Sequence, residues 1–328
     1  MSPRPRTTAV VCAALALAMF FVLSPMATTS APAAPPPPAP PMGRMATSQL
    51  LRGSIPATGG VAVPILRLPT RWMRAGQSIY VRGQMGATTN VPRGPMMGIR
   101  IICLGGSGGT FTVRNHDGRA HGVQYVAVRW VFTAPHDGNY TCELRAVSAT
   151  MIDPRVARLN LVPGRSRLAV SPVGPGAQGW FAGQDTCVGA RAMPRLPRCS
   201  RARSAVFVMA RLLPAGSRRY VTAVTDVQMT REYGKYPGGP SRVRVTLEAI
   251  PATSAGRACA APGTVSRQAT ITTFVHHYKV NLSLPGVRVN RGGGCGVRVL
   301  VRTRVDHLAG NPVTIHDHRY SNAGAWIF

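Results

Sequence analysis

The C-terminal part of the chain carries the histidines that could bind a metal ion. His316 and His318 flank Asp317, so on a strand their imidazoles would point to one side, about 7 Å apart. Either His307 or the pair His276-His277 could add a ligand, and Zn²⁺ needs three or four ligands that converge on it. The alternative is a set of polar side chains on an exposed terminal strand or loop. Spacing alone does not make these ligands converge, so the sequence predicts no metal site and keeps His307, His316 and His318 only as candidates.

Two other patterns resemble parts of catalytic sites. Residues 105–109, GGSGG, match the G-x-S-x-G pattern in which Ser107 would be the nucleophile. That pattern needs a helix after the serine, whereas the strand-like TFTV follows, so a turn between strands is favoured. The ten acidic residues offer no two carboxyl groups spaced to face each other across a cleft, as a glycosidase needs. The sequence therefore predicts a protein that is not an enzyme and has no cofactor.

Arginine is the most distinctive feature of the composition. The chain has 39 Lys and Arg residues against 10 Asp and Glu, which gives a formal net charge of +29. In two segments, 241–247 and 297–305, arginines alternate with valines. This alternation predicts strands with one apolar side in the core and one arginine side in solvent. The arginines expected on the outer side are Arg242, Arg244, Arg298, Arg302 and Arg304.

An arginine-lined strand face suits an anionic polymer. Arginines on one side of a strand lie about 7 Å apart, comparable with phosphate repeats, and guanidinium groups form bidentate pairs with phosphate or sulfate. Aromatic residues make up only 6% of the chain, so platforms for base stacking are scarce. The alternative is a solvated face whose arginine content reflects GC-rich coding. The predicted partner is an anionic cell-wall polymer or another polyanion, and the oligomeric state stays open.

The first 58 residues are typical of export and spacing segments. Arg4 and Arg6 precede the apolar run 9–23, and residues 1–34 are therefore expected to be a secretory signal peptide. A bilayer span needs about 20 apolar residues, so the mature chain is expected to lack a transmembrane segment; a retained signal anchor is the alternative. Residues 35–58 are predicted to be a disordered proline-rich linker, extended as polyproline II. The protein is thus expected to be secreted or associated with the cell envelope.

From residue 59 onward the pattern is that of strands and turns. Short runs rich in Val, Ile, Thr and Tyr alternate with Gly, Pro, Asn and Asp, and no long stretch has helical periodicity. Such a pattern predicts an all-β fold made of antiparallel β-sandwiches. The halves of this region also resemble each other, with two unrelated β segments as the alternative. We therefore predict two tandem β-sandwich domains, 59–163 and 203–328, joined by a Pro/Gly-rich connector, 164–202.

Six cysteines would remain after export, and an even number in an exported chain predicts disulfides. Six cysteines allow 15 pairings. In each half a turn precedes a cysteine at the start of an alternating strand, and another cysteine lies a similar distance upstream. This favours one disulfide in each half and a third within the connector. The predicted pairs are Cys103–Cys142, Cys259–Cys295 and Cys187–Cys199.

One short segment resembles a known family. DGNYTC, residues 137–142, is similar to the end of an immunoglobulin-type domain, where Asp-x-x-Tyr-x-Cys carries a tyrosine corner and the second cysteine of the inter-sheet disulfide. The resemblance implies that Tyr140 hydrogen-bonds to backbone near the turn and that the disulfide of Cys142 connects two sheets. It also implies that Phe132 and Val131 cover that disulfide.

The rest of the immunoglobulin pattern is missing. Trp130 does not lie where the family has its tryptophan, and Gly293 stands where the second half would need a tyrosine. The resemblance thus implies an immunoglobulin-like β-sandwich with a corner. As a whole, the chain is also similar to exported proteins of high-GC Gram-positive bacteria.

Together these patterns predict a secreted, strongly cationic and non-catalytic binding protein. Its predicted ligands are anionic polymers, held by the arginine sides of the strands. The alternative is a secreted hydrolase or metal-binding protein that uses the C-terminal His and Asp residues.

Overall fold

The regular structure of the described chain consists of β-strands alone. This is a computed structural model, and it describes residues 44–57, 59–91, 95–106, 108–116, 122–150, 156–173, 177–180, 186–189, 203–213, 220–231, 239–272, 277–289, 292–316 and 324–327. These residues belong to one compact unit, Ala39–Phe328. The predicted all-β class is confirmed, and no helix in the described ranges is long and apolar enough to span a bilayer.

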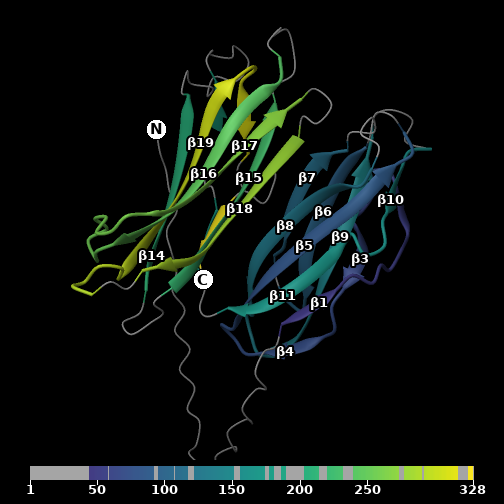
Figure 1. The fold of residues 1–328 in the computed structure, drawn as a ribbon. Coiled ribbons are helices and arrows are strands. Elements are labelled where there is room, and N and C mark those ends of the chain that lie inside the picture. Colours follow the sequence, from purple (N-terminus) through teal and green to yellow (C-terminus); the bar gives the residue numbers. More distant parts are fainter. Residues whose placement is uncertain are drawn as a thin grey trace, which may run out of the picture. The chain divides into compact units, whose positions relative to one another are not determined.

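The first half of the chain forms two antiparallel sheets (Figure 1). One sheet contains β1 (Met45–Thr47), β2 (Ser54–Pro56), β5 (Ser78–Thr89), β8 (Gln124–Thr133), β10 (Arg158–Leu161) and β11 (Arg167–Val173). The other contains β3 (Val63–Arg67), β4 (Arg71–Met73), β6 (Met96–Leu104), β7 (Thr110–Asn115) and β9 (Gly138–Ala149). The strand orders are β1-β11-β5-β10-β2, with β8 also on β5, and β3-β9-β6-β7, with β4 also on β9.

The second half also forms two antiparallel sheets. One contains β12 (Ala177–Trp180), β13 (Thr186–Val188), β15 (Tyr220–Arg231), β18 (His277–Arg288), β20 (Val313–Ile315) and β21 (Gly324–Ile327). The other contains β14 (Ser204–Leu212), β16 (Ser241–Ala252), β17 (Gly263–Ile271) and β19 (Arg298–Ala309). The strand orders are β12-β21-β15-β20-β13, with β18 also on β15, and β14-β19-β16-β17.

The two halves repeat one topology. In each, a long central strand, β5 or β15, pairs with one long strand and with two short late strands. The opposite sheets correspond in the same way, because β3-β9-β6-β7 and β14-β19-β16-β17 have the same order along the chain. The structure thus has two tandem antiparallel β-sandwiches with a shared strand order, which agrees with the likeness between the halves of the sequence.

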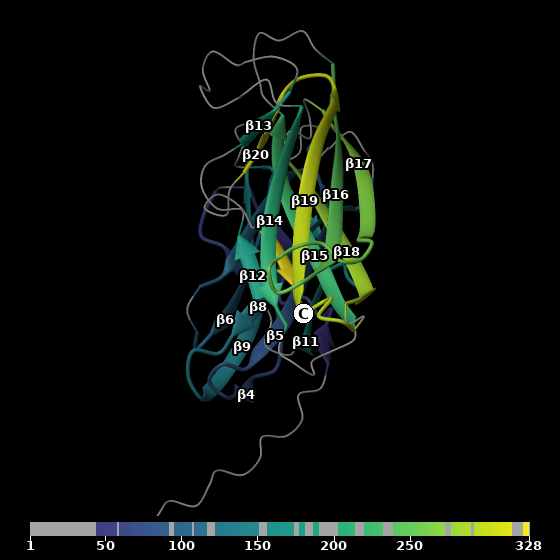
Figure 2. The same cartoon turned by 90° about the vertical axis from the view of Figure 1, so that its left-hand side faces the viewer.

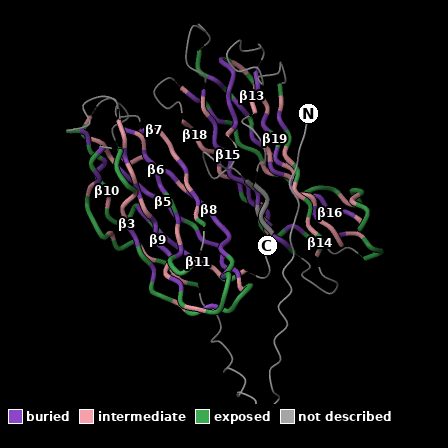
Figure 3. Tube along the Cα trace, turned by 180° about the vertical axis from the view of Figure 1, so that it is seen from behind, coloured by how far each residue is buried: buried purple, intermediate pink, exposed green. Residues whose placement is uncertain are grey.

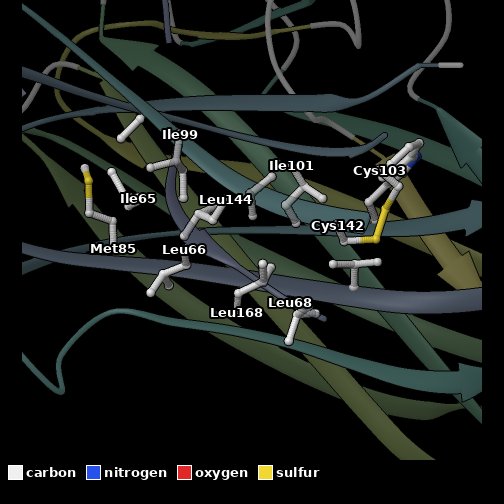
Figure 4. Close-up of a cluster of buried hydrophobic side chains, with 14 of the residues drawn as sticks. Ile65, Leu66, Leu68, Met85, Ile99, Ile101, Cys103, Cys142, Leu144 and Leu168 are labelled. Atoms are coloured by element: carbon white, nitrogen blue, oxygen red, sulfur yellow. A yellow bond between two sulfur atoms is a disulfide. The ribbon is translucent and has the colours of Figure 1, made fainter. Parts of the chain in front are cut away.

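Each sandwich has its own apolar core, to which the long strands contribute buried residues. Figure 3 colours the buried residues along these strands. In the first core, Met85 and Leu168 come from one sheet and Ile99, Ile101 and Leu144 from the other (Figure 4). The relative exposure of all five residues is 0%. The hydrophobic effect of this burial is the main stabilising contribution to each sandwich.

Each sandwich also contains a disulfide, and both disulfides have the predicted partners. Cys103 on β6 is bonded to Cys142 on β9, and Cys259 is bonded to Cys295. The immunoglobulin resemblance nevertheless gives the wrong location for the first disulfide. Cys103 and Cys142 are directly opposite each other on neighbouring strands of one sheet, so their bond links two strands rather than two sheets. The third predicted pair is not described, because Cys187 lies buried in β13 while Cys199 falls outside the described residues.

Replacing both cysteines of the first disulfide, Cys103→Ala with Cys142→Ala, is expected to lower the free energy of unfolding. Loop closure predicts a loss of about 2–4 kcal/mol, because the unfolded chain regains conformational freedom. Denaturant unfolding of the double variant measures the change. An unfolding midpoint equal to that of the wild type would show that the cross-link adds no stability.

The turn before β9 is built around a buried tyrosine. The Tyr140 hydroxyl donates a hydrogen bond to the His136 carbonyl at 2.6 Å, as the resemblance implies. Its ring packs edge-on against Phe132, with centroids 5.2 Å apart. Phe132 shares the buried cluster of the disulfide, whereas Val131 lies on the opposite side of β8 and packs against other residues. The expectation that Val131 covers the disulfide is therefore wrong, because side chains alternate along a strand.

The predicted linker extends too far into the folded chain. Residues 45–56 contain β1 and β2, which pair with β11 and β10 and are not disordered. Ile55 is buried in the first core. Likewise, the predicted connector 164–202 contains β11, a full partner of β5. These short strands lack a clear alternating pattern in the sequence, so only their backbone pairing reveals them; the domain limits themselves remain predictions.

Candidate functional site: the arginine face of the second sandwich

The predicted arginine sides belong to the sheet β14-β19-β16-β17, whose strands Figure 2 shows side by side. The strand register and the burial pattern place these arginines on one face of that sheet. On β16, Val243, Val245 and Leu247 are buried, so Arg242 and Arg244 point the other way and are exposed. On β19, Val299, Val301 and Val305 are buried in the same core. We call the outward set the arginine face; it consists of Arg242, Arg244, Arg298, Arg302 and Arg304.

The strand register places the guanidinium groups in two neighbouring rows. Arg244 lies opposite Asp306, and Glu248 lies opposite Arg302. Within a row, residues two apart are about 7 Å apart along the strand. Neighbouring strands lie about 5 Å apart, so the face offers several cations within the span of a few repeats of an anionic polymer.

Two of the five arginines are paired with acids on the same face. Arg302 forms an ion pair with Glu248, and Arg304 pairs with Asp306 at 2.6 Å. The hydrogen bond that Arg302 Nε donates to the Glu248 carboxylate raises the pKa of Arg302, so this guanidinium stays charged. Five cations and these two carboxylates leave a net charge of +3 on the face.

The other three arginines carry the excess charge. Among the described residues, Arg242, Arg244 and Arg298 form no ion pair with a carboxylate. Arg242 and Arg244 are exposed, whereas Arg298 is half-buried and its Nε is covered. Guanidinium groups of this kind can make bidentate contacts with phosphate, sulfate or carboxylate. The face can therefore bind an anionic group without first breaking an ion pair.

An apolar row lies beside the arginines on β14, and sequence reasoning missed it. Val206, Val208 and Leu212 are 52%, 61% and 59% exposed. In the strand register they lie opposite Arg304, Arg302 and Arg298. Large apolar side chains kept in contact with water often mark a contact surface. In the sequence, both alternating sides of β14 are mainly apolar. The side that faces solvent could therefore not be identified from the sequence.

The candidate metal ligands occupy separate environments. His307 Nε2 is 2.9 Å from the Asn311 carbonyl, and His316 Nε2 is 2.5 Å from the Thr230 hydroxyl. His318 and Asp317 lie outside the described residues. Within the described ranges, no group of three or more His, Cys, Asp or Glu side chains could hold a metal ion.

The serine pattern occupies a connection between two strands of one sheet. β6 ends at Leu104 and β7 begins at Thr110, and the two strands pair antiparallel. Ser107 itself lies outside the described residues. A strand rather than a helix follows the pattern, as expected for a turn.

Several acidic residues serve the structure. Glu143 is buried and forms ion pairs with Arg67 and Arg145 at 2.6 and 2.8 Å. Asp137 accepts a hydrogen bond from the Ala75 backbone at 2.7 Å and so fixes its turn. These carboxylates stabilise strand ends and turns.

A buried charge cluster joins the two halves of the chain, and sequence reasoning missed it as well. Arg129 on β8 forms an ion pair with Asp226 on β15, and Lys279 on β18 lies 3.2 Å from the second oxygen of the same carboxylate. The Asp226 side chain is fully buried, and those of Arg129 and Lys279 are nearly so. We call these three residues the junction cluster.

Electrostatics fix the charge state of the junction cluster. Burial alone would raise the pKa of Asp226, but the charges of Arg129 and Lys279 and the hydrogen bonds outweigh this and lower it. Asn281 Nδ2 donates a further bond to this carboxylate at 2.6 Å, and Arg129 also donates to the Ser283 hydroxyl at 2.7 Å. Asp226 is therefore ionised and pairs with Arg129. Burial lowers the pKa of Lys279, although the nearby Asp226 carboxylate opposes this shift.

Comparisons with known proteins support no transfer of function. No family model and no curated protein matches the chain. One similar solved structure is the CBM22-1-CBM22-2 tandem domain of Xyn10C from Paenibacillus barcinonensis, with a TM-score of 0.24, 9% identity, and 88% of this chain and 94% of that chain covered. Another is a protein of Parabacteroides distasonis assigned as secreted, with a TM-score of 0.19, 8% identity, and 87% and 88% covered. At these scores neither structure bears on the ligand.

Proposed function

We propose that this protein is a secreted, non-catalytic binding protein whose arginine face holds anionic polymers of the cell envelope or the extracellular space. The observation that carries the proposal is the net charge of +3 on one sheet face, with Arg242, Arg244 and Arg298 outside any ion pair in the described chain. A cationic strand face suits a long ligand better than a small one, because its arginines repeat the same kind of contact along the strands.

The overall charge supports the same proposal. A formal net charge of +29 attracts any polyanion over a long range and increases the rate of encounter. The disulfides agree with an oxidising compartment outside the cytosol. The proposed export signal, residues 1–34, lies outside the described residues and remains a prediction from the sequence.

Binding to two chemically different polyanions tests the proposal. Wild-type protein is expected to bind both short duplex DNA and polyphosphate at about 50 mM salt, and to lose most of this binding as salt rises. At about 1 M salt the Debye length is about 3 Å, so binding through exposed charges should be lost. Neutral dextran serves as the control polymer and should not bind. No binding at low salt, or binding that is unchanged at high salt, would overturn the proposal.

A further inference from the structure

A pocket of about 880 Å³ lies where strands of the two halves meet, away from the arginine face. Its volume is within the range of small-molecule sites, roughly 300–1,000 Å³. The first half contributes residues from β5, β8 and β11, and the second half from β15 and β18. The polar side chains that line it are Arg44, Tyr80, Arg82, Arg129, Ser171, Tyr220, Thr222 and Ser283.

Three of the described residues that line the pocket are arginines, and none of those described residues carries a carboxylate. The guanidinium group of Arg129 is already occupied, because it donates hydrogen bonds to Asp226 and Ser283 of the other half. Arg44 and Arg82 are exposed, and among the described residues neither forms an ion pair. Two guanidinium groups thus remain free to bind an anionic group in the pocket.

Arg82 is also held in place. Its guanidinium carbon lies 5.9 Å from the centre of the Tyr80 ring, and Tyr80 is only 6% exposed. A cation beside a fixed aromatic ring loses little conformational freedom when it binds an anion. Arg82 is therefore a preorganised anion contact.

The rest of the pocket lining suits a sugar ring. Tyr220 is 56% exposed, although tyrosine is usually well covered, and so offers a ring face to a ligand. The hydroxyl groups of Ser171, Thr222 and Ser283 supply donors and acceptors for ligand hydroxyls. An exposed aromatic ring, several hydroxyls and unpaired arginines together recognise a polar ring that carries a negative charge.

We propose that this pocket binds an acidic saccharide, a sugar ring bearing a carboxylate or sulfate. Arg82 and Arg44 contact the acidic group, and Tyr220 lies against the ring. Hydroxyl groups of the sugar pair with Ser171 and Ser283. This site is separate from the arginine face, so it stands or falls independently of the proposed polymer binding.

Calorimetry with three disaccharides of similar size tests the proposal. A uronic acid disaccharide and a sulfated disaccharide serve as the acidic probes, and maltose serves as the neutral one. At least one acidic probe is expected to bind, while maltose binds at least about tenfold more weakly because it lacks the charge-assisted contacts. Which acidic probe binds better identifies the acidic group.

Single substitutions then locate the site. Arg82→Gln and Tyr220→Ala are each expected to weaken binding of the acidic probe by about tenfold or more. Arg165→Gln, an exposed arginine outside the pocket, is the matched control and should leave affinity unchanged. Thermal unfolding of each variant shows whether the fold is intact.

Three results would overturn the proposal. These are no binding of either acidic disaccharide, equal binding of maltose, and inorganic sulfate binding as tightly as the sulfated disaccharide. Salt-dependent DNA binding by the Arg82→Gln variant reports on the arginine face separately, so failure of the pocket and failure of the proposed function are distinguishable.

Discussion

Asp226→Ala is expected to lower the free energy of unfolding by about 3–5 kcal/mol, the largest change in stability that we predict. The substitution removes the carboxylate that is paired with both Arg129 and Lys279. Arg129 would then stay charged and buried without the Asp226 carboxylate, and this loss costs much more than the net contribution of the pair. Urea unfolding of the variant and the wild type measures the difference.

Glu248→Ala is the matched control, because it also removes a carboxylate that is paired with an arginine. Its partner, Arg302, has a side chain 43% exposed, so the loss should stay below about 1 kcal/mol. Equal destabilisation by the two substitutions would contradict the importance of burial. Asp226→Asn keeps the shape of the side chain and should still be strongly destabilising, which separates the loss of charge from the loss of packing.

The junction cluster also makes stability dependent on pH. The pKa of Asp226 is lower in the folded protein than in the unfolded chain. Its contribution to stability is therefore fully present above the unfolded pKa and is lost as pH falls through the folded pKa. Wild-type protein should lose stability in acid, and the Asp226→Asn variant should show a smaller acid-dependent loss.

Replacing the three unpaired arginines of the arginine face by glutamine is expected to weaken DNA binding at low salt by on the order of 100-fold. A basic residue at an anionic surface contributes about 1 kcal/mol to the free energy of binding. Replacing three of them should therefore weaken binding by about 3 kcal/mol. Arg302 and Arg304 stay in place with their ion pairs, so the sheet itself should not be disturbed. Fluorescence anisotropy with a labelled duplex measures the affinity.

Three arginines of the first sandwich provide the control for net charge. Arg158, Arg165 and Arg167 are exposed and lie outside both the arginine face and the pocket. Their replacement by glutamine removes the same formal charge and should weaken DNA binding by only a few-fold through the long-range field. If both triple variants lost affinity equally, net charge rather than the arginine face would carry the binding.

Strand alternation made the second sandwich predictable from sequence. Each arginine between valines on β16 and β19 faces outward, since period two leaves no other arrangement once the valines are buried. The likeness of the two halves could also be recognised in the sequence. The turn before Cys142 and the turn before Cys295 precede β9 and β19, which hold the same place in their sheets. Pairing of the cysteines followed from this repeat.

Contacts between the halves could not be predicted in the same way. On β15, Asp226 shares a side with Val224 and Gln228, a mixture that is typical of a solvent-facing side. In the structure this side is covered by the first half, and Asp226 is fully buried. Only the three-dimensional arrangement brings Arg129, distant in sequence, to the same place. The pocket was missed for the same reason, because its lining residues come from five strands and from Arg44, which precedes β1.

The salt dependence of duplex DNA binding tests the arginine face most directly. For duplex DNA, the logarithm of the binding constant falls linearly with the logarithm of salt concentration, by about 0.9 for each phosphate neutralised. Measured across the same salt series, the Arg242→Gln, Arg244→Gln, Arg298→Gln variant should have a slope shallower than that of the wild type by about three. Identical slopes for the two proteins would show that these arginines do not contact the polymer.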